Sequence, residues 1–553
     1  MRRCLVVLSF SSCLLLSSCS GGGGSSTGGG GSHPPPPPPP PAQAGSHVLT
    51  AWSELGMHCM DGKDYSVFAV LPPYNTIHAQ LMLKAEPPVL VSSGVTVTYE
   101  AMADAAGSIN TSSAGKTNFW NYVQVLFLKT VAPEVGLAGN RTQGVIPHPM
   151  TFNSSLGVWE ALGVPTIPYD DAGKRNAYPM AKLVAKDSVG NILATTTVVL
   201  AVSDEMVCST CHASGSKSAA QPASGWVKNA NPLKDAKLNI LKKHDERWNI
   251  SGYLSALSAA GYHYQPSLYQ TAVSGTPILC AACHGTNALG LAGIAGIKPL
   301  TTDMHSMHAT AVNPDTGTTL DSATTPLASC YLCHPGKVTR CQRGAMNKTA
   351  CYDCHGNLSK VGDANRAGWL DVPSCQMCHT NGSRYPTTFD ASGHWRTTTD
   401  ATFATVANRP LPGKSLYRFS AGHGSLYCSA CHGSQHAEYP TLQPNDNVSS
   451  IRMQGYAGKI VECSVCHLTV PSTPNGGPHG MHNIGADWVS AHHDYVNDSN
   501  VTQCAYCHGA DYKGTALSAV PVTRAFTIDG TQKTLAANHK VSCYDCHNGP
   551  GGQ

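Results

Sequence analysis

A five-residue pattern, Cys-x-x-Cys-His, constrains this chain more than any other feature, because it occurs nine times between residues 208 and 547. Two thiols at this spacing can form thioether bonds to the two vinyl groups of one porphyrin, and the imidazole that follows then becomes an axial ligand of the iron. The repeats therefore predict nine covalently bound c-type haem groups, each with its iron, as the cofactors. The cysteines predicted to bind haem are Cys208, Cys211, Cys280, Cys283, Cys330, Cys333, Cys351, Cys354, Cys375, Cys378, Cys428, Cys431, Cys463, Cys466, Cys504, Cys507, Cys543 and Cys546. The histidines predicted as proximal iron ligands are His212, His284, His334, His355, His379, His432, His467, His508 and His547.

Cysteine pairs at this spacing also occur in zinc sites and in redox-active dithiols. Zinc pairs need no histidine directly after the second cysteine, whereas all nine pairs here have one. A redox-active dithiol is expected once, near a βαβ pattern. Neither alternative explains nine motifs of the same form.

Twelve further histidines follow residue 204, which is more than the nine needed to give every iron a second histidine. An iron with two histidine ligands has no open position, which suits electron transfer rather than substrate chemistry. The distal ligands predicted from the sequence are His244, His305, His308, His394, His423, His436, His482, His492 and His539.

A short internal repeat supports part of this assignment. His308 and His482 each precede the first cysteine of a motif by 22 residues, and equal offsets predict equivalent ligands in a duplicated unit. His305 and His479 each lie three residues earlier, on the same face if the stretch is helical. These two histidines are therefore candidates for neighbouring haems.

The first 46 residues predict export and attachment to a membrane. Residues 1–19 hold two arginines followed by a short apolar stretch, which is typical of a secretory signal, and end in Leu-Ser-Ser-Cys, which resembles a bacterial lipobox. Cys19 would then become the lipidated first residue, unless ordinary signal cleavage removes it. The Gly/Ser-rich and proline-rich residues 20–46 predict a tether. We therefore expect an exported outer membrane lipoprotein at the cell surface, held by its lipid anchor only.

Residues 47–203 hold no haem motif and predict an antiparallel β-sandwich-like domain, for which an immunoglobulin-like arrangement is one option. Frequent β-branched residues and intervening turn signals indicate at least six short strands. The expected strands are 65–71, 77–83, 95–101, 122–128, 183–186 and 192–202. A scaffold, a docking module and a cover over the first haem are all possible roles for this domain.

Two cysteines remain after the signal segment and the haem motifs are set aside. They are Cys59, which follows His58 in a distinctive stretch at 56–66, and Cys341. Leftover cysteines of an exported protein often pair, so a Cys59–Cys341 disulfide is one prediction and two separate buried thiols are the other. His58 is either a haem ligand or a buried histidine bonded to the backbone.

Residues 204–553 predict a loop-rich, short-helix multihaem cytochrome c domain. Nine motifs leave about 38 residues for each haem, too few for an ordinary hydrophobic core, so porphyrins must supply much of the buried apolar surface. Helices are expected at 231–248 and 250–260. Without haem this domain should not fold.

The charge of the chain argues against a nucleic-acid partner. The polypeptide has a formal net charge of +3. Each haem adds two propionates to an iron porphyrin, so nine haems would change the total to about −6 when oxidised and about −15 when reduced. An acidic protein is not expected to bind the phosphate backbone.

Three segments resemble outer-surface multihaem c-type cytochrome lipoproteins of metal-respiring bacteria. These segments are 330–346, 351–356 and 368–375. The N-terminal region of the same group is similar to 56–66 and to the Leu-Pro-Pro-Tyr-Asn at 71–75. The resemblance covers most of 50–380. It implies extracellular electron transfer toward metal oxides, electrodes, other redox proteins or partner cells.

Two other functions remain open on the sequence alone. A multihaem oxidoreductase would need one iron with an open position, although all nine motifs carry the ordinary proximal histidine. A filament-forming cytochrome would need haem contacts between copies of the chain, and some relatives in the resembling group do polymerise. An electron carrier is the leading interpretation and assigns no catalytic residue.

Overall fold

The computed structural model describes residues 45–550 apart from 207, 314, 366–372, 374, 381–382, 397–420, 473, 475, 497–499 and 529. The signal segment with Cys19, nearly all of the tether, and much of the segment at 368–375 therefore lie outside the described residues.

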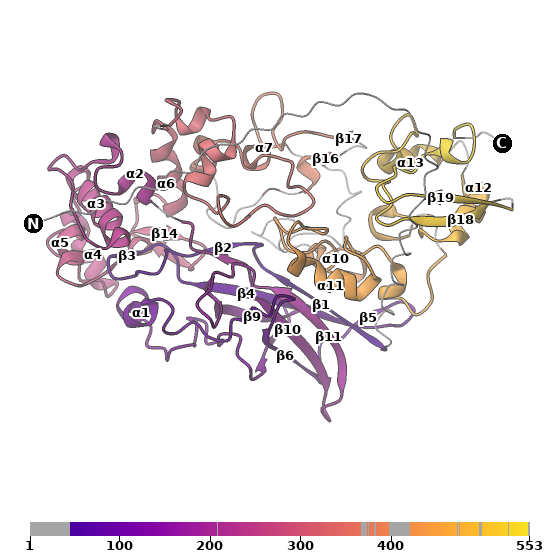
Figure 1. The fold of residues 1–553 in the computed structure, drawn as a ribbon, viewed down its shortest axis with the longest axis horizontal. Helices are drawn as coiled ribbons and strands as arrows, with labels where there is room; N and C mark the ends of the chain where they lie inside the picture. Colours follow the sequence, from indigo (N-terminus) through magenta and orange to yellow (C-terminus); the bar gives the residue numbers. More distant parts are fainter. Residues whose placement is uncertain are drawn as a thin grey trace, which may run out of the picture. The chain divides into compact units, whose positions relative to one another are not determined.

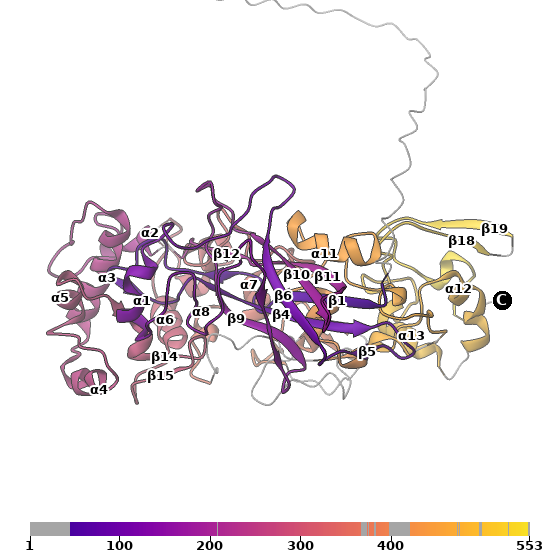
Figure 2. The ribbon, with the colours of Figure 1, turned by 90° about the horizontal axis from the view of Figure 1, so that it is seen from below.

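Two antiparallel sheets form the first part of the described chain (Figures 1 and 2). Most residues along these strands are buried, and each sheet contributes apolar side chains to the domain interior. The first sheet has the order β1-β4-β9-β8, with β5 also pairing to β4, and comprises β1 (His47–Ser53), β4 (Tyr74–Leu83), β5 (Val89–Leu90), β8 (Thr151–Asn153) and β9 (Val158–Pro165). The second has the order β11-β10-β6-β7 and comprises β6 (Val95–Met102), β7 (His148–Pro149), β10 (Met180–Asp187) and β11 (Ile192–Val199).

The two sheets share one hydrophobic core. Leu49 and Ile77 of the first sheet and Val97 and Leu183 of the second are fully buried in the same cluster. Apolar side chains from the inner faces of two sheets interdigitate in this way in a sandwich. The predicted antiparallel N-terminal sheets are thus confirmed, and four of the six expected strands coincide with β4, β6, β10 and β11.

The expected strand at 122–128 is wrong, because this segment is the helix α1 (Phe119–Phe127). Its buried residues are Phe119, Val123 and Leu126, a helical spacing that places them on one face. The apolar and aromatic residues here satisfy strand propensity equally well, so tertiary packing against the rest of the cluster decides the outcome.

The expected strand at 65–71 is also mostly wrong. Only β3 (Phe68–Ala69) is a strand, and it pairs in parallel with β13 (Ile278–Leu279). The buried carboxylate of Asp61 accepts the backbone N–H groups of Val70, at 2.5 Å, and Leu71. These N–H groups are therefore not available to a strand ladder.

A second hydrophobic cluster crosses the domain boundary expected at residue 204. It combines residues such as Tyr65, Phe68 and Leu126 with Leu238 and Leu279. The short parallel pair of β2 (His58–Cys59) with β12 (Val202–Ser203) lies at the same boundary. The boundary itself stays a prediction, since residues on both sides of it build one core.

Residues after 204 form short helices joined by long loops, as expected for this region. The predicted helix at 231–248 is α3 (Pro232–Arg247), which begins after Asn231, whose side chain accepts the N–H of Leu233. The other helices are α2 (Ser209–His212), α4 (Leu254–Ala259), α5 (Leu268–Val273), α6 (Leu300–Ala309), α7 (Cys351–His355), α8 (Leu358–Val361), α10 (Cys428–His432), α11 (Pro444–Gln454), α12 (Ala486–Tyr495) and α13 (Val501–His508). The remaining strands form hairpins, β14 (His284–Thr286) with β15 (Leu291–Gly293), β16 (His379–Thr380) with β17 (Ser383–Arg384), and β18 (Arg524–Ile528) with β19 (Thr531–Leu535).

The helices α10 and α11 lie against the sheets (Figure 1). The side chain of Gln80 on β4 accepts the N–H of Tyr427 at 2.9 Å and donates to the carbonyl oxygen of Ser425 at 3.2 Å. Thr196 on β11 is hydrogen-bonded to Ser449 at 3.0 Å.

Among the described residues, no helix has the length and apolar character that crossing a bilayer requires.

Candidate functional site

Each Cys-x-x-Cys-His motif folds into a single helical turn. In several of them the backbone N–H of the histidine donates to the carbonyl oxygen of the first cysteine, as in His334 to Cys330 at 2.8 Å and His467 to Cys463 at 2.8 Å. A turn of this kind places residues separated by three or four positions on one side of the chain. The two thiols and the imidazole of a motif can therefore approach one ligand together.

Among the described residues, eight of the nine motif histidines lie beside a second histidine ring. The ring centres lie between 5.9 and 6.5 Å apart, and the two partners come from different parts of the chain. The pairs are His212 with His308, His284 with His244, His334 with His305, His355 with His436, His432 with His479, His467 with His423, His508 with His482, and His547 with His492.

This spacing fits an iron held between two imidazoles. With metal–nitrogen bonds of about 2.0 Å, two rings that bind one metal ion from opposite sides have their centres roughly 6.4 Å apart. Aromatic rings in direct contact also have centres about 4.5–7 Å apart, so the distance alone does not distinguish the two arrangements. The recurrence of a histidine beside the motif histidine, at eight motifs, is what points to an iron between the rings.

The other ring nitrogen of many of these histidines is fixed by a backbone carbonyl oxygen. On α6, Nδ1 of His305 lies 2.6 Å from the carbonyl oxygen of Thr301, and Nδ1 of His308 lies 2.7 Å from that of Met304. A carbonyl oxygen can only accept, so Nδ1 carries the proton and Nε2 keeps its lone pair for a metal ion. The same kind of contact occurs in His284, His482, His492, His508 and His547.

The structure places seven of the nine proposed distal histidines beside a motif histidine. The remaining two, His394 and His539, lie elsewhere. In the described part of the chain, neither His394 nor His539 faces a motif histidine. The His394 side chain is exposed, and Nε2 of His539 lies 2.9 Å from the carboxylate of Asp545, which occupies the nitrogen that would bind iron. None of the eight pairs above includes His379.

His479 is the partner that the sequence assignment left out. It faces His432 with ring centres 6.0 Å apart. The signal that pointed to it was its position three residues before His482, in the same relation as His305 to His308. The repeat is not used equivalently, however, because His308 faces His212 while His482 faces the motif that it precedes by 22 residues.

Two distal partners have unusual backbones. His436 and His479 adopt positive φ angles of 63° and 59°. This left-handed conformation is uncommon for a residue with a side chain and persists where the surroundings demand it. At both positions the turn directs the imidazole at a motif histidine, so the backbone cost supports placement of a ligand.

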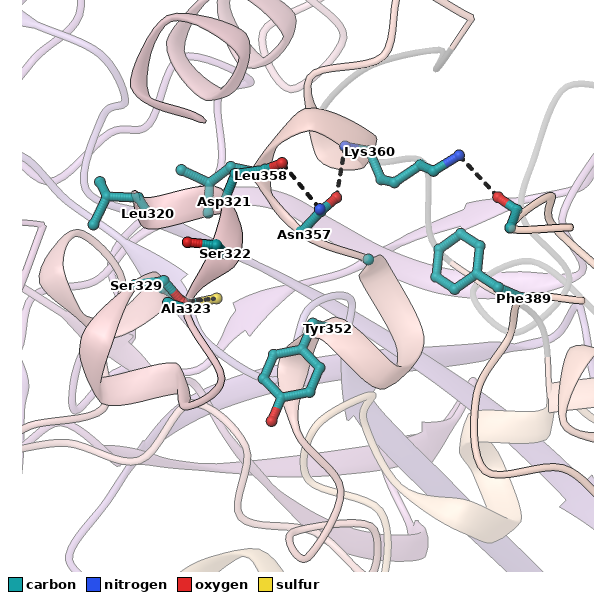
Figure 3. Close-up of a pocket in the computed structure, with 13 residues that line it drawn as sticks. Leu320, Asp321, Ser322, Ala323, Ser329, Tyr352, Asn357, Leu358, Lys360 and Phe389 are labelled. Atoms are coloured by element: carbon teal, nitrogen blue, oxygen red, sulfur yellow. Dashed lines mark hydrogen bonds between the residues drawn. The ribbon is translucent and has the colours of Figure 1, made fainter. Parts of the chain in front are cut away.

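A cavity of about 310 Å³ lies beside Cys330, the first cysteine of the third motif (Figure 3). Leu320, Leu358, Tyr352 and Phe389 line it with apolar and aromatic surface. A motif thiol at the edge of an apolar cavity fits the attachment of a flat macrocycle. The lining of this cavity therefore suits part of a porphyrin.

Thiols of different motifs interact with one another. Cys351 lies close enough to Cys330 to lower the pKa of the Cys330 thiol to about 6. Burial raises the pKa of Cys431 to about 12, and the neighbouring Cys466 adds to the shift. Further interacting pairs are Cys280 with Cys208, Cys333 with Cys208, Cys354 with Cys378, Cys375 with Cys428, and Cys543 with Cys504. The attachment points of successive motifs thus lie near one another.

Cys59 and Cys341 are free thiols in the structure and lie close enough to influence each other. Burial raises the pKa of the Cys59 thiol, and Cys341 is the next largest cause of that rise. Sγ of Cys341 also lies 3.5 Å from Nδ1 of His436. The disulfide between these cysteines stays a prediction. His58, which neighbours Cys59, is buried on β2 and lies edge-on to the ring of Tyr74.

Comparison with known proteins adds a family relationship for the second half of the chain. Residues 343–552 match the family model described as outer membrane cytochrome MtrC/MtrF-like, domains II/IV. Residues 343–552, the MtrC/MtrF-like segment, are thus similar to those cytochrome domains. No curated protein and no solved structure matches the chain.

The MtrC/MtrF-like segment contains six of the nine motifs and all of α7, α10, α11, α12 and α13. It overlaps the region of the sequence resemblance, 50–380, only between residues 343 and 380. The match makes this segment similar to domains II/IV of outer membrane cytochromes, and it reaches motifs that the resemblance had left uncovered.

Proposed function

We propose that the chain carries electrons through nine covalently bound c-type haems, at the outer surface of the outer membrane. The eight histidine pairs, each with ring centres about 6 Å apart, are the observation that carries this proposal. Two histidine ligands leave an iron no position for a substrate, so the pairs favour electron transfer over catalysis. When bound, the haems would supply reversible one-electron Fe(III)/Fe(II) chemistry.

The protein residues have three tasks in this proposal. The motif cysteines would hold each porphyrin covalently, and the paired histidines would bind its iron. The backbone carbonyl oxygens that accept from Nδ1, such as those of Thr301 and Met304, orient the rings and maintain their tautomer. The cysteines of successive motifs lie near one another, as Cys330 and Cys351 do, so the haems bound there would be neighbours.

Location and partners follow from the MtrC/MtrF-like match together with the N-terminal sequence. Lipidation at Cys19 would anchor the chain in the outer membrane, and residues 20–46 would hold the folded part away from the bilayer. Other redox proteins and extracellular acceptors such as metal oxides are the proposed partners. Assembly of several copies into an oligomer or a filament is compatible with this role, and nucleic acid is not a proposed partner.

Low-temperature electron paramagnetic resonance of the oxidised protein, with total haem quantified, tests the proposal. We expect nine haems per chain and only low-spin ferric signals. A high-spin signal equal to one-ninth of the haem would favour an oxidoreductase with one open iron. Long unbranched fibres of purified protein in electron micrographs would favour the filament-forming cytochrome.

Labelling with a fatty acid tests the anchor. Cys19→Ala should abolish incorporation of labelled palmitate and release the protein from the membrane fraction. Cys13→Ala changes a different cysteine of the signal segment and serves as the control. This variant should keep both the palmitate label and its place in the membrane fraction. Retention of label in the Cys19 variant would contradict lipidation at this residue.

A further inference from the structure

The loop between β4 and β5 contacts the seventh haem motif directly. Oε2 of Glu86 lies 3.3 Å from Nδ1 of His467, and Oε1 of Glu86 accepts the backbone N–H of Thr469 at 2.6 Å. From the same loop, Nζ of Lys84 donates to the carbonyl oxygen of Ser464 at 3.3 Å. The first sheet thus reaches the motif Cys463–His467 through two side chains of opposite charge.

His467 differs from the other paired histidines of the described chain in what its Nδ1 bonds to. In several of the others Nδ1 meets a neutral backbone carbonyl oxygen, as in His508, where the acceptor belongs to Val541, and in His436 it meets the thiol of Cys341. Nδ1 of His284 lies 3.0 Å from a carbonyl oxygen and 3.5 Å from the carboxylate of Asp303, so the neutral acceptor is nearer. Nδ1 of His244 is 3.9 Å from a carboxylate, which is beyond hydrogen-bond range.

The loop after the motif holds the carboxylate of Glu86 beside His467. Oε1 accepts the backbone N–H of Thr469 at 2.6 Å, while Oε2 lies 3.3 Å from Nδ1 of His467. The His467 side chain is 13% exposed and that of Glu86 is 42% exposed. The imidazole is therefore largely shielded, while its carboxylate partner reaches solvent.

We propose that Glu86 is a positioning residue that lowers the reduction potential of the haem attached at Cys463 and Cys466. A carboxylate that accepts from Nδ1–H draws the proton toward itself, so Nε2 becomes a stronger donor to iron. A stronger donor stabilises the ferric form more than the ferrous form, which lowers the potential. This inference rests on the proposed binding of haem at this motif. It gives the N-terminal sheets a redox role in addition to packing.

Lys84 provides a matched control within the same loop. Its Nζ donates to the carbonyl oxygen of Ser464, inside the motif Cys463–His467, so its positive charge also lies at this motif. A positive charge near the iron stabilises the ferrous form, the opposite of the effect of Glu86. The two residues therefore predict shifts of different sign, whereas simple loss of loop contacts would give the same sign for both.

Potentiometric titration of the purified holoprotein, followed by optical and electron paramagnetic resonance spectra, measures these shifts. In Glu86→Gln we expect one haem in nine to titrate at a higher potential than in the unchanged protein, with the others unaffected. Glu86→Asp should restore part of the difference. In Lys84→Gln the potential of that haem should be lower or unchanged.

Two results would overturn the inference. One is a Glu86→Gln titration that superimposes on that of the unchanged protein, and the other is an upward shift in both Glu86→Gln and Lys84→Gln. Both are distinguishable from failure of the proposed function. That failure would show as fewer than nine haems, or as high-spin iron, in the unchanged protein itself.

Discussion

Arg343 and Asp446 form a buried ion pair that connects the start of the MtrC/MtrF-like segment to α11. Nε of Arg343 donates to the carboxylate at 2.6 Å and Nη2 donates at 3.0 Å. Nη1 donates to the carbonyl oxygen of Gly56 at 2.6 Å, so the same guanidinium also reaches the N-terminal region. The Arg343 side chain is 1% exposed, and its five donors make it well suited to joining three segments.

Replacement of Arg343 by methionine should destabilise the holoprotein by about 3–5 kcal/mol, because Asp446 would remain as a buried charge without its cation. Chemical denaturation followed by far-UV circular dichroism measures the change. Lys182→Met, which removes a partly exposed pair with Glu100, should cost less than about 1 kcal/mol. Equal effects of the two substitutions would show that burial of the Arg343 pair contributes little.

His479→Ala should convert one of the nine ferric irons from low-spin to high-spin, because His432 would lose the ring that faces it. His394→Ala should leave the low-spin signals unchanged, since the His394 side chain is exposed. Quantitative electron paramagnetic resonance of both oxidised variants measures the difference. A high-spin signal in the His394 variant and none in the His479 variant would contradict the pairing.

The stability of the protein should depend on the titration of Asp61. Burial raises the pKa of this carboxyl to about 6, despite the opposing influence of Lys237. The folded state therefore holds the proton more tightly than the unfolded state, and this contribution to stability is present below pH 4 and lost as the pH rises to 6. Between pH 4 and pH 6 the free energy of unfolding of Asp61→Asn should therefore rise by up to about 3 kcal/mol relative to that of the unchanged protein.

Thermal melting of both proteins at several pH values between 4 and 7 tests this dependence. Asp187→Asn is the control, because the side chain of Asn191 and nearby backbone N–H groups lower the pKa of Asp187, which predicts a dependence of the opposite sign. A difference between the Asp61 variant and the unchanged protein that stays constant with pH would show that Asp61 titrates normally.

Without haem, the two sheets should persist while the motif region loses its structure. The core of the sheets consists entirely of residues from 49–200, whereas the region after 204 depends on porphyrins for much of its buried surface. Hydrogen exchange of a chain produced without haem attachment should therefore show protected amides in β4, β6 and β10, and unprotected amides in α7 and α10. Protection of both sets would indicate that the motif region folds on its own.

The sequence determined the cofactor class, and it did so through covalent chemistry. The spacing within Cys330–His334 and its eight counterparts is local, so no knowledge of the fold is needed to see that two thiols and an imidazole can serve one porphyrin. Strands such as β6 and β10 and the helix α3 were also predictable, because their patterns of buried residues are local. The prediction of a strand at 122–128 was wrong. Aromatic and β-branched residues favour strands by propensity, but they also form a helix when one face of that helix is buried.

Only the tertiary structure decided which histidines face one another. His355 and His436 are far apart in the sequence, and His432 and His479 are separated by α11 and the motif Cys463–His467, so no periodicity relates the partners. Likewise, nothing near Glu86 in the sequence signals its contact with His467, 381 residues away. Which two histidines lie together depends on how distant segments of the chain pack against each other. That packing involves many residues, so the spacing of residues within one motif cannot predict it.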